Sequence, residues 1–487
     1  MQVFGMLSFM GRTAAKTRVP DKPVRRSRAA QRTGRRTAGI SIRNYPSALD
    51  FLTTRTNYEL MSRVGYNTSN FNLSRMLRIL NALGNPHRAF KSAHIAGTKG
   101  KGSTSHMLAA MLQRAGYRTG LYTSPHFVDM RERIRVNGEM VSEADFTRLI
   151  ARIAPIAIRL AKEKPTFFEL ITAAGFLHFA HCKVDIAVIE TGLGGRLDAT
   201  NVIKPEVCGI TNISYDHTAQ LGSTLEAIAE EKAGIFKPGV PVICAPQRPG
   251  VKRVLRERAA KVGCELRFVG YDLEFSYRFE CSRATGPHSR VCMATPTTRF
   301  DHVRVPLLGE HQAYNCAVAL GMIDALRQRG MAVNPQDAID GLAEVKVQGR
   351  LETIRTMPHT IVDAAHNAAS VAALMRAIGQ NIPYDSMVVI FGCSADKDID
   401  GMLDELQLGA DKVIFTSTGT PRSADPYELL ARFQEKSQKM AQVEPELRDA
   451  YATACRCVSR EDLICITGSV HLVGHAKKTL AAPGAAY

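Results

Sequence analysis

The chain has 487 residues, more than one hydrophobic core usually spans, and this length predicts two domains. Hydrophobic residues make up 45% and charged residues 22%, as in globular proteins, and no apolar run approaches the roughly 18 residues of a membrane helix, which excludes a membrane partner. The 11 cysteines are scattered, without a C-x-x-C metal pair or a secreted disulfide framework, so they favour a reducing, cytoplasmic compartment.

The net charge of +17 is concentrated at the N-terminus. Residues 1–44 hold eleven Lys and Arg side chains against one Asp, so ten of the seventeen excess charges lie there. This basic extension is predicted to be disordered. Three interpretations of it stay open: a solvated arm without a role, an organelle-targeting segment, and a translated stretch upstream of the true start. A nucleic-acid-binding ATPase is the function class that such a tail would suggest, and deletion of residues 1–44 would test it.

From Tyr45 onward, short β-branched runs alternate with amphipathic stretches, which predicts an α/β fold with a mostly parallel sheet and crossover helices. We expect the strands of the first domain, residues 45–345, at 93–96, 119–122, 184–190, 207–212 and 240–244. Residues 270–305 are irregular and are expected to form strands or an excursion within that domain. A second, smaller α/β domain is expected at 346–487, with strands at 360–363, 387–391, 412–416 and 463–466.

A glycine-rich segment follows the first expected strand and opens an amphipathic helix. It reads H-I-A-G-T-K-G-K-G-S-T at residues 94–104, and apolar side chains recur at helical spacing after it. Gly97, Gly100 and Gly102 would let backbone N–H groups approach phosphate oxygens, and Lys101 could reach the β- and γ-phosphates. The spacing is shorter than that of the usual phosphate loop, so a plain glycine-rich turn is the alternative. Lys99 is interpreted as a solvated loop cation rather than a second catalytic lysine.

Three ionisable residues follow further strands or helices. Glu190 ends an apolar strand, where α/β folds bind ligands, so it is a candidate Mg²⁺ ligand; a carboxylate that caps a neighbouring helix is the alternative. His217 follows the next strand and, taken alone, is more often an ordinary loop histidine. Lys232 lies in a helix-like setting, and in isolation it reads as a surface lysine paired with a glutamate.

Taken together, the motifs resemble one family. They are G-T-K-G-K-G-S at 97–103, L-Y-T-S-P-H at 121–126, T-G-L-G-G-R-L-D-A-T-N at 191–201, D-H at 216–217, E-K-A-G-I-F-K at 231–237, G-E-H-Q-A-Y-N at 309–315, G-R at 349–350, D-A-A-H-N at 363–367, F-G-C-S-A-D-K-D at 391–398, P-R at 421–422 and T-G-S-V-H at 467–471. In this order, over about residues 45–475, they resemble the folylpolyglutamate synthase and dihydrofolate synthase family of the Mur ligase superfamily.

The resemblance implies an N-terminal P-loop-type ATPase domain, a C-terminal Rossmann-like glutamate-ligase domain and ligation of L-glutamate to a folate-type carboxylate through an acyl phosphate. ATP would contact Gly97, Thr98, Gly100, Lys101, Gly102, Ser103, Asn315, Arg350 and Asp363. Mg²⁺ would be held by Ser124, Glu190 and His217. Lys232 matches the position where the superfamily carries a carbamylated lysine, which would act as a carboxylate-like group near a second metal.

The implied substrate side involves both domains. His366, Arg422, Ser469 and His471 would line the glutamate side, and with Lys101, Lys232 and Arg350, His366 belongs to the expected catalytic set. Phe168 is a candidate platform for the pterin ring, with a core aromatic as the alternative. The small-molecule substrates would be dihydropteroate or tetrahydrofolate and L-glutamate, and the resemblance favours a monomer without a nucleic-acid partner. The acceptor, the polyglutamate length and any K⁺ requirement stay open.

Three departures from the family pattern limit the transfer. The usual Asn after G-T is Lys99, W-P-G-R reads V-Q-G-R at 347–350, and D-G-A-H-N-P reads D-A-A-H-N-A at 363–368. None of them removes a charged catalytic group. The alternative function is a peptidoglycan-type Mur ligase acting on another carboxylate; such enzymes carry a separate uridine-nucleotide-binding domain before the phosphate loop, and only about 50 foldable residues precede Gly97.

Overall fold

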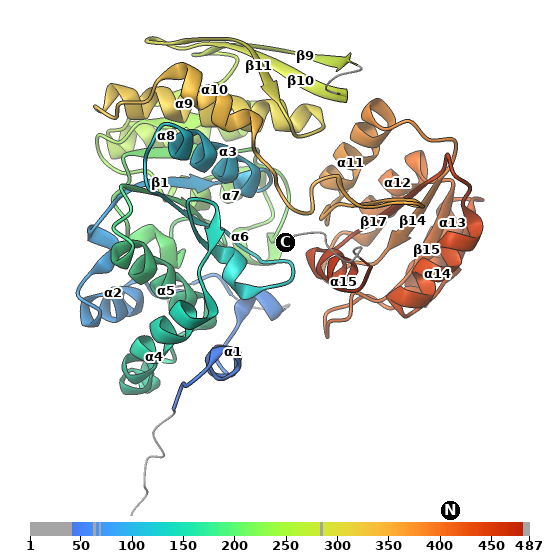
Figure 1. Ribbon diagram of the computed structural model, residues 1–487, viewed down its shortest axis with the longest axis horizontal. Helices are drawn as coiled ribbons and strands as arrows, with labels where there is room; N and C mark the ends of the chain where they lie inside the picture. The colour runs from blue at the N-terminus through green and yellow to red at the C-terminus, as the bar shows by residue number, and fades with distance from the viewer. Residues whose placement is uncertain (1–40, 62–64, 68–69, 283–285, 481–487) are drawn as a thin grey trace, which may run out of the picture. The chain divides into compact units, whose positions relative to one another are not determined.

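The computed structural model describes residues 41–61, 65–67, 70–282 and 286–480 (Figure 1). Most of the predicted basic extension, residues 1–40, lies outside them. The next residues enter the fold directly, because Asn44 caps helix α1 (Tyr45–Thr53) by accepting a hydrogen bond from the backbone N–H of Ser47. None of the helices in these ranges is both long and apolar enough to cross a membrane.

The first sheet has eight strands: β1 (Lys91–Ala96), β2 (Thr119–Tyr122), β3 (Ile134–Val136), β4 (Glu139–Met140), β5 (Ile186–Glu190), β6 (Val207–Ile210), β7 (Val242–Cys244) and β8 (Leu266–Phe268). Their order is β4-β3-β2-β5-β1-β6-β7-β8. The neighbours from β2 to β8 pair in parallel, and β3 and β4 add an antiparallel edge. The predicted mostly parallel sheet is thus confirmed, with every expected strand present.

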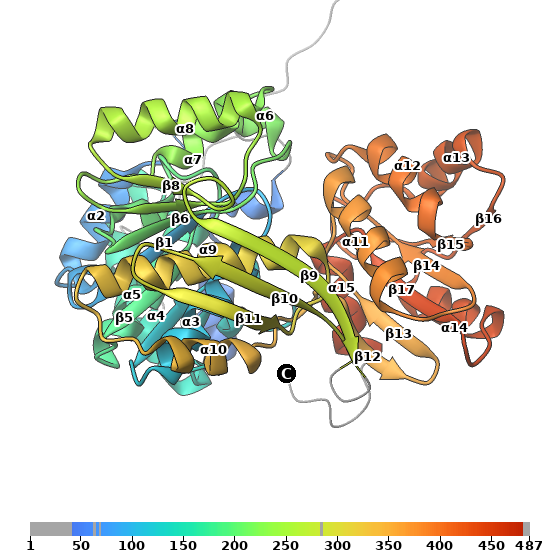
Figure 2. The same cartoon turned by 90° about the horizontal axis from the view of Figure 1, so that it is seen from above.

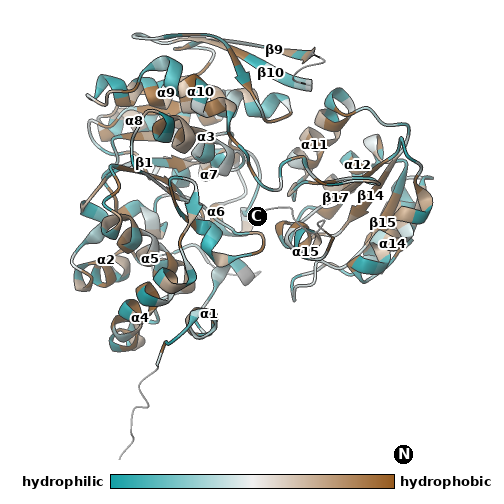
Figure 3. Cartoon of the chain, in the orientation of Figure 1, coloured by the Kyte–Doolittle hydropathy of each residue, from teal (hydrophilic) through white to brown (hydrophobic). Residues whose placement is uncertain are grey.

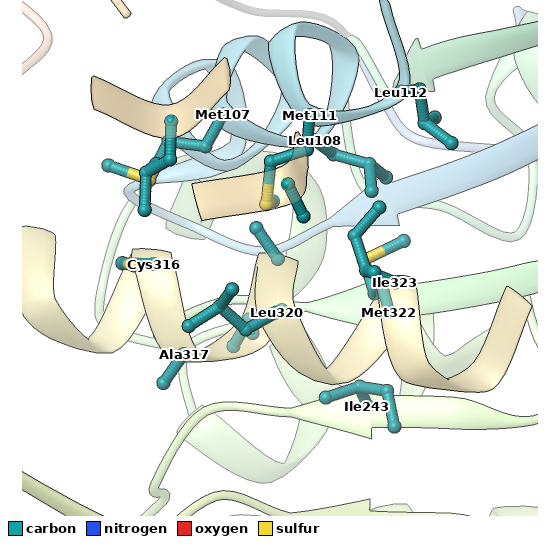
Figure 4. Packing of buried hydrophobic residues seen from close by; sticks show 14 of the residues in the cluster. Met107, Leu108, Met111, Leu112, Ile243, Cys316, Ala317, Leu320, Met322 and Ile323 are labelled. Atoms are coloured by element: carbon teal, nitrogen blue, oxygen red, sulfur yellow. The ribbon is translucent and has the colours of Figure 1, made fainter. Parts of the chain in front are cut away.

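Besides α1, the α-helices up to residue 343 are α2 (Leu73–Ala82), α3 (Lys101–Arg114), α4 (Glu143–Arg159), α5 (Phe167–His181), α6 (Thr218–Leu221), α7 (Leu225–Ala233), α8 (Pro249–Val262), α9 (Glu310–Gln328) and α10 (Pro335–Ala343). They cover both faces of the sheet because successive side chains of a strand point to opposite faces. Ile95 of β1 packs with α3 and α9, whereas Ala96 packs with α7 and α8. Figure 4 shows Met111 of α3 and Leu320 of α9 in the first of these cores.

A buried ion pair ties α2 to α5. Arg75 donates from Nε to both carboxylate oxygens of Glu169 at 2.8 Å, and its Nη atoms donate to the carbonyl oxygens of Glu163 and Asn70. The two side chains are only 7% and 5% exposed. The guanidinium is therefore fully engaged in this corner of the fold.

Replacing Arg75 with methionine is expected to lower the free energy of unfolding by about 3 to 5 kcal/mol, because it leaves the Glu169 carboxylate buried without its partner. Arg78 lies on the same helix, is 55% exposed and pairs with Glu163 at the surface, so Arg78→Met is the matched control and should cost less than about 1 kcal/mol. Urea unfolding measures both values. Equal losses in the two variants would contradict a special role for the buried pair.

Residues 270–305 form a small sheet of their own. It consists of β9 (Glu274–Ser282), β10 (Gly286–Ala294) and β11 (Arg299–Val305), all antiparallel in the order β11-β10-β9 (Figure 2). Val291, Phe300 and Val303 join the core that contains α9. The segment looked irregular in sequence because only one face of the sheet is buried.

The third sheet has six strands: β12 (Glu352–Thr356), β13 (His359–Val362), β14 (Met387–Phe391), β15 (Lys412–Phe415), β16 (Met440–Val443) and β17 (Leu463–Thr467). Their order is β12-β13-β17-β14-β15-β16, parallel except for β12. The helices α11 (Ala368–Asn381), α12 (Ile399–Gly409) and α13 (Pro426–Lys436) cover one face, and α14 (Leu447–Cys457) and α15 (Val470–Leu480) cover the other. Because both faces are covered, β14 is continuously hydrophobic, and so is β17 up to its last residue, Thr467 (Figure 3).

Candidate functional site

The glycine-rich loop joins the carboxyl end of β1 to the N-terminus of α3, as predicted. Gly97 and Gly100 have φ angles of 151° and 89°, and added Cβ atoms would lie 1.8 Å from Thr211 Oγ1 and 2.1 Å from Asn315 Oδ1. Gly100 is the N-cap of α3 and supplies no side-chain cap, so the first N–H groups of the helix remain available to an anion. Lys101 begins the helix. This geometry fits a phosphate cradle, and the side chain of Asn315 lies against it.

The interpretation of Lys99 as a solvated cation is wrong. Its side chain is only 23% exposed, and Nζ donates to Asp216 Oδ2 at 2.9 Å and contacts His366 Nε2. The backbone N–H groups of Thr98 and Lys99 both donate to the carbonyl of Asn212, which holds the loop against the segment after β6. Burial lowers the pKa of Lys99 to about 8, although the carboxylate of Asp216 opposes this shift. The side chain therefore faces the site.

Glu190 ends β5 beside the first turn of α3. It is 4% exposed, and Oε2 accepts a hydrogen bond from the backbone N–H of Ser124 at 3.0 Å. Burial raises the pKa of this carboxyl, while the nearby charge of Lys101 lowers it. Glu190 and Ser103 line one small cavity. The hydroxyl oxygen of Ser103 is buried without a hydrogen-bond partner in the described part of the chain. A carboxylate and unpartnered hydroxyl oxygen are the hard ligands that Mg²⁺ prefers, so these residues fit a magnesium ion.

His217 lies in the loop after β6, with φ of 50° and a side chain that is 42% exposed. Its Nε2 is 3.9 Å from Asp216 Oδ1. Among the residues with assigned structure, no three His, Cys, Asp or Glu side chains are grouped so that they could hold a metal ion. A magnesium ion held by Glu190 would therefore also need ligands from hydroxyl, phosphate or water oxygens.

Lys232 is not a surface lysine. It lies on α7 with 4% exposure, and Nζ donates to the carbonyl oxygen of Gly97 at 2.7 Å. Burial is the largest cause that holds the pKa of Lys232 well below its usual range, and repulsion from Lys101 is the next. An amine that loses its proton easily is the form of lysine that reacts with carbon dioxide. The alternative of an ordinary exposed ion pair is excluded.

Arg350 and Asp363 lie next to strands of the third sheet, before β12 and after β13. Arg350 lines the same cavity as Glu190, and its Nη1 donates to the carbonyl of Gly349 at 2.9 Å. Asp363 follows β13, and its carboxylate accepts hydrogen bonds from the backbone N–H groups of Leu351 and Ala365. Burial raises its pKa, and the charge of Arg350 opposes this rise. Arg350 is thus brought from a distant part of the sequence to the cavity lined by Gly102 and Ser103 of the phosphate loop.

The predicted glutamate-side residues make separate sets of contacts. His366 contacts Lys99, as described above. Arg422 instead donates from Nη2 to Asp396 and from Nη1 to the carbonyl of Glu59, both at 2.6 Å. Ser469 is buried, and its hydroxyl accepts a hydrogen bond from the backbone N–H of His471 at 3.2 Å. Arg422 is therefore already engaged by protein groups.

Phe168 stands on the first turn of α5, whose N-terminus is closed by a capping box between Thr166 and Glu169. Its ring is half-buried beside that of Tyr122, with centroids 6.3 Å apart, and an added Cβ at Gly192 would lie 2.4 Å from it. The ring lies at the rim of this core, so it packs against the core and also keeps some exposure.

Asp216 and Lys397 were not predicted as site residues. Asp216 is 9% exposed, and Oδ1 accepts a hydrogen bond from Lys397 Nζ at 2.7 Å. Burial favours its neutral form, but the charge of Lys99 and other neighbours outweighs burial and holds its pKa well below the usual range. Both residues lie within recognised motifs, D-H and S-A-D-K-D, which was the available signal. A cavity of about 640 Å³ beside them is also lined by Arg248 and Asn367.

Two family models match the chain. The Mur ligase middle domain matches residues 95–323, and the Mur ligase glutamate ligase domain matches residues 349–470. Dihydrofolate synthase/folylpolyglutamate synthase of Bacillus subtilis is 33% identical over 413 residues, which cover 84% of this chain and 94% of the relative. The enzyme of the same description from Mycobacterium tuberculosis is 34% identical over 438 residues, with 83% and 89% covered.

Solved structures agree with these relatives. Folylpolyglutamate synthase of Mycobacterium tuberculosis, complexed with ADP and AMPPCP, superposes with a TM-score of 0.79 at 33% identity, covering 84% of this chain and 95% of that one. FolC of Escherichia coli, in complex with DHPP and ADP, has a TM-score of 0.77 at 27% identity and covers 90% and 98%. The similarity therefore spans all three sheets.

Proposed function

The chain belongs to the folylpolyglutamate synthase and dihydrofolate synthase family of Mur ligases, which are ATP-dependent ligases, and we propose that it joins L-glutamate to the carboxylate of dihydropteroate or tetrahydrofolate. The observation that carries this proposal is the convergence of Ser103, Glu190 and Arg350 on one cavity at the phosphate loop, with the charge of Lys101 acting on Glu190. The acceptor carboxylate would attack the γ-phosphate of ATP to give an acyl phosphate and ADP. The amine of glutamate would then attack the carbonyl and expel phosphate.

The phosphate loop would hold ATP through Gly97, Thr98, Gly100, Lys101, Gly102 and Ser103. Asn315, against the loop, would contact the nucleotide, while Arg350 would contact the triphosphate and Asp363 the ribose. Magnesium would be held by Ser124, Glu190 and His217, with Ser103 as a further hydroxyl ligand, and it would supply charge neutralisation at the phosphates. Lys101 would place a fixed positive charge at the γ-phosphate, where negative charge develops in the transition state.

Lys232 would carry a carbamate in the active enzyme. Its low pKa supports this assignment, because the neutral amine is the reactive form. In the unmodified state Nζ donates to the carbonyl of Gly97, and the one N–H that a carbamate keeps on Nζ could still make this contact. Carbamylation would therefore give the site a second anionic group beside the phosphate loop.

Removing bicarbonate and carbon dioxide is accordingly expected to lower the turnover number about tenfold or more, with recovery when bicarbonate is restored. Lys232→Met should show low activity that bicarbonate does not change. Turnover measured in decarbonated buffer tests this, and equal wild-type rates with and without bicarbonate would argue against the carbamate.

The glutamate side would be formed by His366, Arg422, Ser469 and His471, and Phe168 would face the pterin ring. We place the boundary between an ATP-binding domain and a glutamate-ligase domain at residues 346–350, supported by the separation of the third sheet from the other two. A monomer is proposed on the family resemblance alone. All 11 cysteines are free thiols, which supports a reducing, cytoplasmic location.

The acyl phosphate step is tested with an acceptor whose carboxylate carries a heavy oxygen label. One labelled oxygen should appear in the released phosphate for each amide formed, because the acceptor oxygen becomes the bridge that breaks. Mass spectrometry of phosphate measures the label. Unlabelled phosphate alongside product would exclude the acyl phosphate.

A further inference from the structure

The ammonium group of Lys99 lies in a site built from Asp216 and His366. Nζ is 2.9 Å from Asp216 Oδ2 and in hydrogen-bond contact with His366 Nε2, and these two acceptors are themselves 3.5 Å apart. The Asp216 side chain is 5% exposed and that of His366 is 25% exposed. The three atoms form a triangle in which a cation is held between a carboxylate and an imidazole.

The imidazole of His366 is fixed so that Nε2 is an acceptor. Its Nδ1 lies 2.8 Å from the carbonyl oxygen of Ala364, which can only accept, so Nδ1 carries the proton. Neutral imidazole then has its lone pair on Nε2, directed at Lys99. Asn367 next to it donates to the carbonyl of Tyr215, which keeps this turn beside the Asp216 loop. The site is thus arranged for a group that brings N–H donors and a positive charge.

His366 already belongs to the proposed glutamate side. We propose that Asp216 joins it in binding the ammonium group of the incoming amino acid, and that Lys99 occupies this site until nucleotide binds. The proposal rests on the ligase function proposed above. A lysine ammonium and the α-ammonium of an amino acid are both compact cations with three donors, so the same two acceptors recognise either. While Lys99 is present, the amino acid must displace it, which weakens its apparent affinity.

The surroundings fit a dicarboxylic amino acid. The cavity of about 640 Å³ beside Asp216 is lined by Lys397, Arg248 and Asn367, whose side chains can pair with carboxylates. The carboxylates of Asp396 and Asp398 also line it, but they are engaged by Arg422 and by the N-terminus of α12. Lys397 Nζ is held 2.7 Å from Asp216 Oδ1, on the other carboxylate oxygen from Lys99. Asp216 therefore keeps one cationic partner when Lys99 leaves.

Nucleotide supplies the reason for Lys99 to leave. Lys99 belongs to the phosphate loop, two positions before Lys101 and one before the α3 N-cap Gly100. A triphosphate bound at that helix N-terminus adds several negative charges close to the lysine backbone, and they compete with the single carboxylate of Asp216. Bound nucleotide should therefore raise the affinity for the amino acid, and the bound amino acid should raise the affinity for nucleotide by the same factor.

Calorimetric titration of the full chain with L-glutamate, with and without AMPPCP and magnesium, tests the proposal. The wild type should bind glutamate about tenfold more tightly with AMPPCP. Lys99→Met should bind glutamate equally well in both conditions, within about twofold, because the competing ammonium is absent. Lys204→Met replaces an exposed loop lysine and should behave as the wild type.

A second variant tests the acceptors. Asp216→Asn should weaken glutamate binding roughly thirtyfold or more in both conditions, because one member of a buried charge pair is lost. Unchanged glutamate affinity in Asp216→Asn, or nucleotide coupling in Lys99→Met as large as in the wild type, would overturn the proposal, as would no glutamate binding with AMPPCP. Failure of the proposed function would show differently, as wild-type enzyme that releases no ADP from ATP with any folate-type acceptor.

Discussion

Replacing Lys101 with methionine is expected to lower the turnover number about a thousandfold. The residue starts α3 at the phosphate loop, where its charge would neutralise the γ-phosphate as the acceptor carboxylate attacks. Loss of one such group in a preorganised site costs about a hundred- to a thousandfold in rate. Methionine keeps the length and apolar stem of the side chain, so the packing of the helix is retained. ADP release under saturating ATP, acceptor and glutamate measures the effect.

The matched control is Lys91→Met, an exposed lysine at the start of β1 in the same strand, loop and helix unit. It should keep the wild-type rate. If Lys101→Met kept more than about a tenth of the wild-type turnover, the charge at this position would not act on the transferred phosphoryl group.

Replacing Glu190 with glutamine is expected to lower turnover about a hundredfold or more and to raise the magnesium concentration needed for half-maximal rate. The amide oxygen of glutamine can still accept the hydrogen bond from the backbone N–H of Ser124, so the local structure is preserved. What is lost is the negative charge, and a hard divalent cation depends on that charge. Magnesium titration of ADP release at fixed ATP separates the two effects.

Glu139→Gln, at an exposed position of β4, serves as the control for loss of a carboxylate. Addition of excess EDTA should stop the wild type and leave both variants inactive, with recovery when magnesium is restored. Wild-type magnesium dependence in Glu190→Gln would remove this residue from the metal site.

Nine strands of the two parallel sheets could be predicted because each is a short apolar run with a polar or glycine-rich end. β3, β4 and β8, at or next to the edges of the first sheet, were not expected, because they are short and mostly not fully buried. Strands 119–122 and 387–391 agree at both bounds, and the others differ at their ends, where hydrogen bonding rather than hydrophobicity sets the limit. β9–β11 were harder because a sheet with one exposed face mixes polar and apolar residues. β12 and β16 lie at the edges of the third sheet and carry few buried side chains.

The candidate site was predictable where chemistry resides in a compact motif. The phosphate loop and Glu190 fall at strand ends, and the sheet topology alone brings them together. The environment of Lys99 was not predictable, because its burial depends on Asp216, His366 and Lys397, which are distant in sequence. The motif of Arg422 likewise assigned this residue to the site. Its contacts with Asp396 and with the carbonyl of Glu59 could not be predicted.

The most direct measurement is ADP release by the purified protein with magnesium, ATP and glutamate, comparing dihydropteroate, tetrahydrofolate and no acceptor. The ligase function predicts turnover that requires both a pterin acceptor and glutamate, with one amide formed for each ADP. ADP release at full rate without glutamate, or none with either acceptor, would contradict it.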